Sequence, residues 1–489
     1  MRQAPSAVIA PFRHPLVACA VAVALASASV APGADRYVST TGSDTGNAGT
    51  VSSPFRTIAY AVSVASAGDG IVLRGGTYAE SLYIQKANIA IRAYNNESAA
   101  ITASITDSAQ ANTVWFAAGG GSITGIDISG GYYYSLRFDL GPGLARGCRI
   151  HDSGYNVVKL VPYADNITLD GCEIYNSGRR DPNGLGVDSV GGSYLTVRGC
   201  NIHDTTSEAI YAKGGARGCV FEGNIVHDIG GSGIGLGQDT GPQFMVNPPW
   251  ENIDGIVRNN IIYNVQGAGM FCYAAQNPTF VNNTCINVAI SYQAGLFVAR
   301  NGAGQGCTGV VIENNIIRMV STRPSVFIAT GGLAGAFTSN RNCFAGNVSF
   351  SDDNRGAYGW SLATWRTGTG QDIASLQADP LLDVAFHLTP GSPCIDAGMS
   401  LATAATDYDG QLRPSGSGFD IGADERSSAA TTPPPPTTTP PTSSNTATAS
   451  ASDASAGGCG IGSGMAGFAL ALLAARQGAR RRELQPLGR

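Results

Sequence analysis

Lysine is nearly absent from this chain of 489 residues: Lys86, Lys159 and Lys213 are the only three, against 27 arginines. Charged residues make up 13% of the chain and the formal net charge is −5. Such a composition lacks the basic surface on which nucleic-acid binding depends, so we expect no nucleic-acid partner. The scarcity also makes the two lysines of the central region, Lys159 and Lys213, easy to weigh as functional candidates.

Several other features are missing. No central segment keeps a helical apolar period over 11 residues without glycine, and the 65 glycines suit a turn-rich β protein instead. The Gly-x-Ser-x-Gly motif of serine hydrolases does not occur. The cysteine spacing does not indicate a disulfide framework. These absences argue against a helical bundle, a serine hydrolase and a disulfide-stapled domain.

A short phrase, typified by Gly147-Cys-Arg-Ile-His-Asp and Gly199-Cys-Asn-Ile-His-Asp, recurs through the middle of the chain. Its copies start 22 to 36 residues apart, at Gly125, Gly147, Gly171, Gly199, Gly223, Asn259, Asn282 and Asn314. Such a period predicts a solenoid whose units bury apolar faces against their neighbours. Because each copy alternates and is rich in β-branched residues, we predict an all-β, right-handed parallel β-helix.

Stacked copies turn sequence positions into columns about 4.8 Å apart. The fourth position of the phrase is aliphatic and predicts an inward stack that runs from Ile128 to Ile317. The second position changes from cysteine to four successive asparagines: Asn224, Asn260, Asn283 and Asn315. Buried amides are costly unless they bond to one another, so we interpret these four as a structural ladder.

The region before the repeats carries Arg36-Tyr-Val-Ser, a polar turn, and then Ser53-Pro-Phe-Arg-Thr-Ile-Ala-Tyr-Ala-Val. Apolar residues at Phe55, Ile58, Ala59 and Val62 predict a short amphipathic helix that caps the solenoid. Residues 36–80 resemble the opening of secreted right-handed β-helix proteins of the pectate-lyase-like superfamily. This resemblance implies architecture and maps no catalytic residue.

The two ends of the chain resemble export and sorting signals. Residues 1–34 have the charged start and apolar run of a signal peptide. Residues 427–456 form a Pro/Thr/Ser-rich linker, and residues 457–489 combine Cys459, an apolar run and an arginine cluster, which resembles the MYXO-CTERM class of sorting tails. We expect an exported monomer at the cell surface or outside the cell, processed or attached at Cys459 by envelope sorting machinery.

Between these ends we expect a cap with first rungs at 35–95, repeats at 96–348 and a closing module at 349–426. The last of these resembles the choice-of-anchor modules of bacterial β-helix proteins through motifs such as Asp407-Tyr-Asp-Gly and Asp420-Ile-Gly-Ala-Asp-Glu. Its acidic turns at Asp407, Asp409, Asp420 and Asp424 fit either Ca²⁺ ligation or plain Asx-turn chemistry.

Alternation places one group of polar residues on the outer side of the strand that follows the repeated phrase. Lys159, Asp188, Tyr211 and Lys213 share this face if the insertion at 177–186 keeps the strand register. Two insertions border this face: the first wall loop at 177–186 and the second wall insertion at 239–254. Together with the neighbouring strand they supply candidate substrate-binding residues: Arg179, Arg180, Trp250, Phe271 and Tyr273. Insertions on one face of a solenoid are where binding sites develop.

These residue types fit β-elimination of a uronate-containing polysaccharide. A lysine whose pKa is lowered by a neighbouring cation can remove the C5 proton, which nominates Lys213 beside Lys159, with Tyr211 as proton donor. Asp188 and Asp239 could hold Ca²⁺ to neutralise the substrate carboxylate. Ca²⁺ is the only cofactor we expect.

Three alternatives remain open at this stage. A glycoside hydrolase would use a carboxylate pair such as Asp188 and Glu208. A non-catalytic surface glycan-binding protein or adhesin would need only the exposed aromatic residues. The column of His151, His203 and His227 could bind a metal or move protons, although a stack of His and Tyr rings is an ordinary way to cover the flank of a β-helix.

Overall fold

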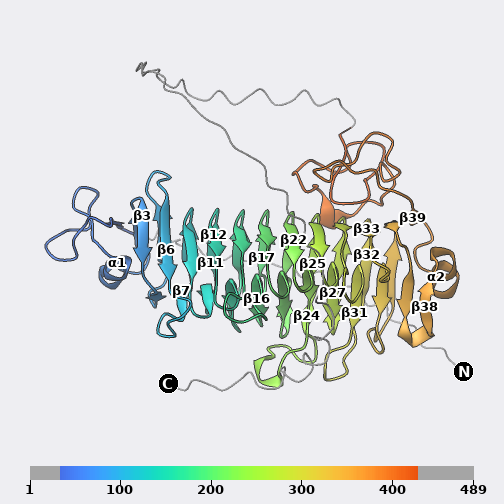
Figure 1. The fold of residues 1–489 in the computed structure, drawn as a ribbon, viewed down its shortest axis with the longest axis horizontal. Helices are drawn as coiled ribbons and strands as arrows, with labels where there is room; N and C mark the ends of the chain where they lie inside the picture. The colour runs from blue at the N-terminus through green and yellow to red at the C-terminus, as the bar shows by residue number, and fades with distance from the viewer. Residues whose placement is uncertain (1–32, 428–489) are drawn as a thin grey trace, which may run out of the picture. The chain divides into compact units, whose positions relative to one another are not determined.

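The computed structural model describes residues 33–427, and three parallel sheets of 12 strands each dominate it (Figure 1). The first sheet consists of β1 (Asp35–Val38), β2 (Gly70–Leu73), β5 (Ala90–Ala93), β8 (Gly121–Thr124), β11 (Gly143–Arg146), β14 (Ile167–Asp170), β17 (Thr196–Arg198), β21 (Val220–Glu222), β25 (Ile256–Arg258), β29 (Thr279–Val281), β32 (Val310–Glu313) and β35 (Phe337–Asn340).

The second sheet follows the first at every turn of the chain. It consists of β3 (Gly76–Ala79), β6 (Ala99–Ala103), β9 (Asp127–Gly130), β12 (Arg149–His151), β15 (Glu173–Tyr175), β18 (Asn201–His203), β22 (Ile225–Ile229), β26 (Ile261–Val265), β30 (Thr284–Ile286), β33 (Ile316–Met319), β36 (Cys343–Gly346) and β39 (Leu376–Gln377).

The third sheet completes each turn, and a small sheet lies beside it. The third sheet consists of β4 (Leu82–Ile84), β7 (Asn112–Phe116), β10 (Tyr134–Phe138), β13 (Val158–Leu160), β16 (Val187–Val190), β19 (Ile210–Lys213), β23 (Ile234–Leu236), β27 (Met270–Tyr273), β31 (Leu296–Ala299), β34 (Val326–Ile328), β37 (Phe350–Asp352) and β38 (Ala357–Trp360). The small sheet consists of β20 (Ala216–Arg217), β24 (Asn252–Ile253) and β28 (Ala275–Gln276). Apart from the antiparallel β37–β38 pair, the named strands pair in parallel, so each turn of three strands is one rung of a parallel β-helix.

The predicted aliphatic column is stacked in register. Ile128 pairs with Ile150, and the pairing continues rung by rung to Ile317. These side chains are buried, because alternate residues of each short strand point into the solenoid. The repeat period read from the sequence therefore does correspond to one rung.

The four asparagines lie fully buried in one interior column, at the turn between the first and second sheets. The Nδ2 of Asn224 donates to Oδ1 of Asn260 at 2.9 Å, Asn260 donates to Asn283 at 2.9 Å, and Asn283 donates to Asn315 at 3.0 Å. Asn342, which the repeat pattern did not include, extends the column by one rung at 3.2 Å. The ladder thus satisfies amides that would otherwise be unpaired in the core.

We expect Asn260→Ala to lower the free energy of unfolding by about 2–4 kcal/mol, since it leaves buried donors of the neighbouring rung without an acceptor. Oδ1 of Asn260 accepts both the backbone N–H and the side-chain amide of Asn224. The urea midpoint measures the effect, and Asn183→Ala in an exposed loop is the matched control. An equal midpoint in both variants would contradict a stabilising ladder.

Helices cover both ends of the solenoid. α1 (Ile58–Val64) packs its buried Ile58, Ala61 and Val62 near β1, β2 and β4, and Thr57 caps its first turn. Ala59, expected on the inward face, is exposed because the helix starts only after Thr57. At the other end, α2 (Leu362–Thr369) buries Trp365 against Phe350 (5.0 Å between ring centroids), a second cap that the sequence did not predict.

The closing segment after β39 is mostly irregular apart from η3 (Ala402–Ala404) and lies beside the turns of the solenoid (Figure 1). Side-chain hydrogen bonds attach it there. Asn282 donates to the carbonyls of Asp420 and Gly422 at 3.0 and 3.1 Å. Within the segment, the fully buried guanidinium of Arg413 donates to Glu425 at 2.8 Å. One ion pair therefore organises a segment with little regular structure.

Residues 1–32 and 428–489 lie outside the described part, and with them most of the predicted signal peptide, nearly all of the linker, and Cys459 with its tail. Among the helices of residues 33–427, none has the length and apolar character needed to cross a membrane. The nine cysteines of this part are buried free thiols.

Candidate functional site

The third sheet brings the predicted polar cluster together on its outer face. Lys159 on β13 pairs in register with Asp188 on β16, Asp188 pairs with Tyr211 on β19, and Val190 pairs with Lys213. The insertion at 177–186 therefore leaves the register unchanged. Strand pairing alone sets these residues on three successive rungs.

Asp188 is the centre of the cluster and is only 5% exposed. Its Oδ2 accepts a hydrogen bond from the ammonium of Lys159 at 2.5 Å and another from Asn156 Nδ2 at 2.7 Å. Lys159 and Asn156 thus hold the Asp188 carboxylate in one orientation beside the first wall loop. Asn156, in the turn before β13, was not anticipated from the sequence; its only signal was its place in the loop ahead of the strand that carries Lys159.

Lys213 lies at the end of β19, where its Nζ is 4.7 Å from the centroid of the Tyr211 ring. Nζ also donates to the carbonyl of Asp239 at 3.2 Å and to Gln238 Oε1 at 3.4 Å. Burial lowers the pKa of Lys213, and the Lys159 ammonium lowers it further, although Asp188 and two glutamates act in the opposite direction. The net effect enlarges the fraction of neutral amine.

Tyr211 is on the outer side of β19 as expected, but it is only 5% exposed. Leu185 from the wall loop and Phe271 from β27 enclose it in a small apolar cluster. Burial raises the pKa of Tyr211 well above its usual range, and the neighbouring Asp188 carboxylate adds to the shift. The phenol therefore stays protonated and faces Asp188. The Tyr211 ring packs against Nζ of Lys213.

Phe271 requires a correction, because the structure excludes it as a surface contact for substrate. It is 1% exposed, since it packs with Leu185, Tyr211 and Ala268 under the wall loop. Sequence alternation placed it on the outer side of β27 correctly but could not show what covers that side. Tyr273 on the same strand is partly exposed, and its hydroxyl accepts from Gln293 at 3.2 Å.

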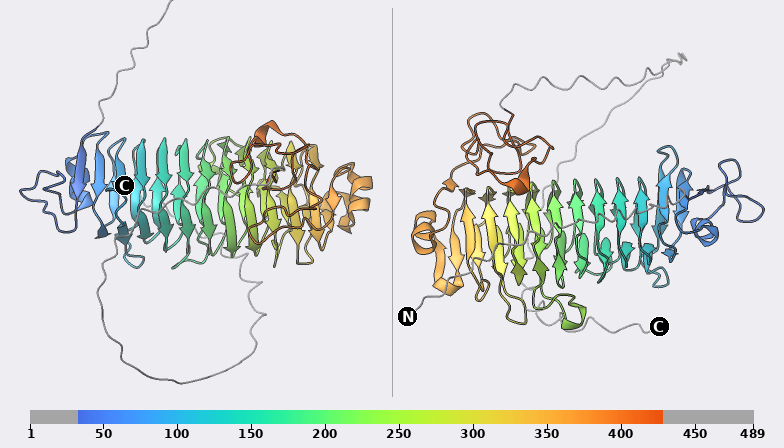
Figure 2. Two further views of the ribbon diagram at one scale, coloured as in Figure 1. Left: turned by 90° about the horizontal axis from the view of Figure 1, so that it is seen from above. Right: turned by 180° about the vertical axis from the view of Figure 1, so that it is seen from behind.

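The second wall is the insertion after β23, which includes η1 (Pro242–Phe244) and projects from the stack below β24 (Figures 1 and 2). Glu251 anchors it: this fully buried carboxylate accepts from the backbone of Gly214 at 3.0 Å and from the Thr240 hydroxyl at 2.6 Å. Trp250 lies beside it and is partly exposed. Glu251 thus attaches the insertion to the backbone of Gly214, the residue that follows Lys213.

The first wall loop carries both predicted arginines, and both are exposed. The Arg180 guanidinium lies 3.6 Å above the Tyr132 ring, and Arg179 approaches Asp152 at 3.6 Å. Cation–π contact keeps the Arg180 charge at the surface, where it can meet an anionic ligand.

Asp239, the second predicted Ca²⁺ ligand, is exposed and accepts the backbone N–H of Gly302 at 2.8 Å, while the Asp188 carboxylate is engaged by Lys159. In the described part of the chain, one group of at least three His, Cys, Asp or Glu side chains has its ligand atoms close together: those of His387, Asp409 and Asp424 lie within 4.8 Å of one another. That group belongs to the closing segment, whose Asp407 and Asp420 accept backbone N–H groups in turns.

The histidine column forms a continuous stack of rings. His151, Tyr175, His203, His227 and Tyr263 follow one another with centroids 4.6 to 4.9 Å apart and planes within 10°. Each histidine also bonds through Nδ1 to the aspartate that follows it in sequence, at 2.7 to 2.8 Å. This packing matches the flank-covering interpretation.

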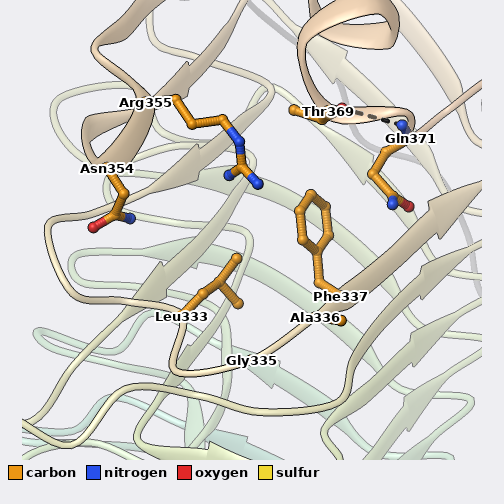
Figure 3. Close-up of a pocket in the computed structure, with 8 residues that line it drawn as sticks. All are labelled: Leu333, Gly335, Ala336, Phe337, Asn354, Arg355, Thr369 and Gln371. Carbon is orange, nitrogen blue, oxygen red and sulfur yellow. Dashed lines mark hydrogen bonds between the residues drawn. The ribbon is translucent and has the colours of Figure 1, made fainter.

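A hollow of about 540 Å³ lies near the C-terminal cap, away from the outer face of the third sheet (Figure 3). Arg355 is the charged residue that lines it, and it is paired with Asp352. Asn354, Thr369 and Gln371 supply polar groups, but the lining has no acid–base pair. The outer face of the third sheet therefore remains the better candidate for chemistry.

Comparison with known proteins supports the architecture. A model of the family described as right handed beta helix region matches residues 142–305. The chain has the right-handed parallel β-helix fold. A second model, described as a protein of unknown function (DUF1565), matches residues 40–91, and no curated protein matches this chain.

Two solved structures resemble the β-helix over most of its length. One, described as pectate lyase Pel9A, shares 18% identity with a TM-score of 0.52 and covers 81% of this chain and 98% of its own. The other, XylC in complex with xylose, shares 11% identity with a TM-score of 0.50 and covers 80% and 98%. At such identities the likeness establishes the fold alone.

Proposed function

We propose that this β-helix is an exported protein that binds an acidic polysaccharide and cleaves it by β-elimination, with Lys213 as the base. The observation that carries the proposal is a lysine with a lowered pKa, held between the Tyr211 ring and the second wall insertion on one face of the solenoid. The β-helix fold shared with a structure described as a pectate lyase supports the same reaction class. Residues 1–34 and 457–489 support export and surface sorting.

The chemistry balances with the residues present. The neutral Lys213 amine takes the C5 proton of a uronate, the C5–H electrons form the C4=C5 double bond, and the C4–O bond to the leaving sugar breaks. The leaving oxygen takes a proton from solvent, because the buried Tyr211 phenol faces Asp188. Tyr211 is therefore a positioning residue in this scheme, rather than the proton donor expected from the sequence.

The carboxylate next to C5 must be neutralised for its neighbouring proton to become acidic. A protein cation is one way to supply this charge, and Arg179 and Arg180 in the exposed wall loop are the cations that the sequence nominated for contact with the polymer. Ca²⁺ held between the substrate and the exposed Asp239 carboxylate is the other way to supply the charge, whereas Asp188 is buried and bonded to Lys159 and does not fit this role.

A panel of acidic polysaccharides tests the proposal directly. Purified protein is incubated with polygalacturonate, alginate and other uronate polymers, with Ca²⁺ and with chelator, and ultraviolet absorbance of the unsaturated product is followed. Product that survives chelation would assign the neutralising charge to a protein cation rather than to Ca²⁺. Binding without product on any polymer would favour the alternative of a non-catalytic glycan-binding or adhesin protein, and saturated reducing ends would favour a glycoside hydrolase.

The pH dependence of cleavage should report the lowered pKa of Lys213. Activity rises as the base loses its proton, so the rising limb of kcat/KM should fall below the usual lysine pKa of about 10.4. Lys159→Met removes a neighbouring positive charge, which raises the pKa of Lys213 and moves the limb to higher pH. A limb that stays in place in this variant would contradict the assignment.

A further inference from the structure

A second cluster lies on the same outer face, on the N-terminal side of Lys159. Arg137 on β10 pairs with Lys159, Trp115 on β7 pairs with Arg137, and Tyr83 on β4 pairs with Trp115. The sequence analysis assigned no role to any of these three. Strand register aligns them with the candidate site in one row along the solenoid.

The three side chains form an ordered platform. The Tyr83 and Trp115 rings lie 4.4 Å apart between centroids, and the Arg137 guanidinium lies 4.2 Å from the centroid of Trp115. Asp139 holds two of them at once, since Oδ2 accepts from Trp115 Nε1 at 2.8 Å and Oδ1 accepts from Arg137 Nε at 2.6 Å. The carboxylate therefore fixes the indole and the guanidinium in one arrangement.

The platform stays open to solvent despite this order. Tyr83 is 53% exposed, and the Arg137 side chain is 25% exposed. Among residues 33–427, no acceptor bonds the Nη groups of Arg137, so one edge of its fork remains for a ligand. Preorganised aromatic faces beside a partly unused guanidinium suit a ligand that is apolar on one side and anionic on the other.

We propose that Tyr83, Trp115 and Arg137 form a distal binding subsite for an acidic sugar residue of the same polysaccharide that Lys213 attacks. The exposed Tyr83 ring would contact the C–H face of the pyranose, and the Nη groups of Arg137 would bind its carboxylate, while Trp115, packed between the two, holds both in place. The identity of this ligand rests on the proposed function.

The distance between the subsite and Lys213 determines how long a glycan must be to contact both. Trp115 on β7 and Lys213 on β19 are four rungs apart, which is about 19 Å at about 4.8 Å per rung. An extended glycan must therefore cover several sugar units to touch both. The subsite should strengthen binding of long chains and leave the shortest cleavable oligomers unaffected.

Binding measurements on the full chain carrying Lys213→Ala test the subsite without turnover. Calorimetric titration with long polygalacturonate or alginate fragments should show a Kd about tenfold weaker for Trp115→Ala and for Arg137→Gln. Tyr358→Ala, at an exposed aromatic in β38, and Arg198→Gln, in an exposed Arg–Asp pair on the first sheet, are the matched controls and should bind like the parent. Circular dichroism checks folding, and Tyr83→Ala substitutes if Trp115→Ala misfolds.

The outcomes separate the two proposals. Parent-like affinity in Trp115→Ala, Tyr83→Ala and Arg137→Gln would overturn the subsite even if the wild-type chain cleaves its substrate. Absence of cleavage by the wild-type chain, with weakened binding in these variants, would refute only the lyase reaction. A parent chain that binds no acidic polymer of the panel would overturn both.

Discussion

Lys213→Ala should lower kcat/KM for elimination by about 10²–10⁴-fold, the usual contribution of a positioned general base. Nζ of this residue has the lowered pKa and lies between the Tyr211 ring and the second wall insertion. Removal of the amine takes away the proton acceptor but none of the exposed residues that would bind the polymer. We therefore expect kcat to fall while KM changes little, measured by initial rates of unsaturated product.

Lys213→Arg tests whether Lys213 acts as a base or only through its positive charge. A guanidinium keeps the positive charge near Asp188 but is not deprotonated in proteins, so it cannot act as a base. We expect this variant to be as inactive as Lys213→Ala. Retained activity would show that Lys213 only stabilises negative charge, and full activity in both variants would remove it from the site.

Arg413→Met should cost about 3–5 kcal/mol of unfolding free energy, because it leaves a buried carboxylate without its partner. Arg413 and Glu425 are both fully buried, and Arg413 also donates to the carbonyls of Gly422 and Ala423 at 2.9 and 2.7 Å. Burial of an unpaired charge is among the costliest single changes in a protein interior. Denaturant midpoints, or loss of protease resistance confined to the closing segment, measure the effect.

Two controls define that prediction. Arg92→Met breaks an exposed pair with Asp35 and should cost no more than about 1 kcal/mol. Adding Glu425→Gln to Arg413→Met removes the orphaned charge and should recover part of the loss. If the double variant is no more stable than Arg413→Met, the carbonyl contacts of Arg413 rather than its ion pair hold the segment.

Much of the architecture was accessible from sequence because a solenoid converts chain period into spatial stacking. The pairing of Ile128 through Ile317, the interior asparagine column and the outer row with Lys159, Asp188 and Tyr211 all follow from one repeat length. The capping helix was also predicted, although its start at Ile58 turned Ala59 outward.

The sequence predicted correctly to which side of a strand these side chains point, but not which of them other residues would bury. Alternation correctly sent Phe271 and Tyr211 to the outer side of their strands, yet the wall loop folds Leu185 over both and buries them. Loop paths depend on contacts between residues distant in sequence, which no periodic pattern encodes. The Tyr83–Trp115–Arg137 platform was not anticipated either, since Tyr83 and Trp115 precede the first copy of the phrase and Arg137 lies between two copies.

By itself, the sequence determined the β-helix, its inward columns and the face on which Lys159 and Lys213 lie, because each of these depends on local alternation and a repeat near the length of one rung. Only the tertiary structure decided which outward residues reach solvent, how Asp188 binds Lys159 and Asn156, and how burial lowers the pKa of Lys213. Burial and ion pairing are properties of many rungs and two insertions packed together, so they exist only once the chain is folded.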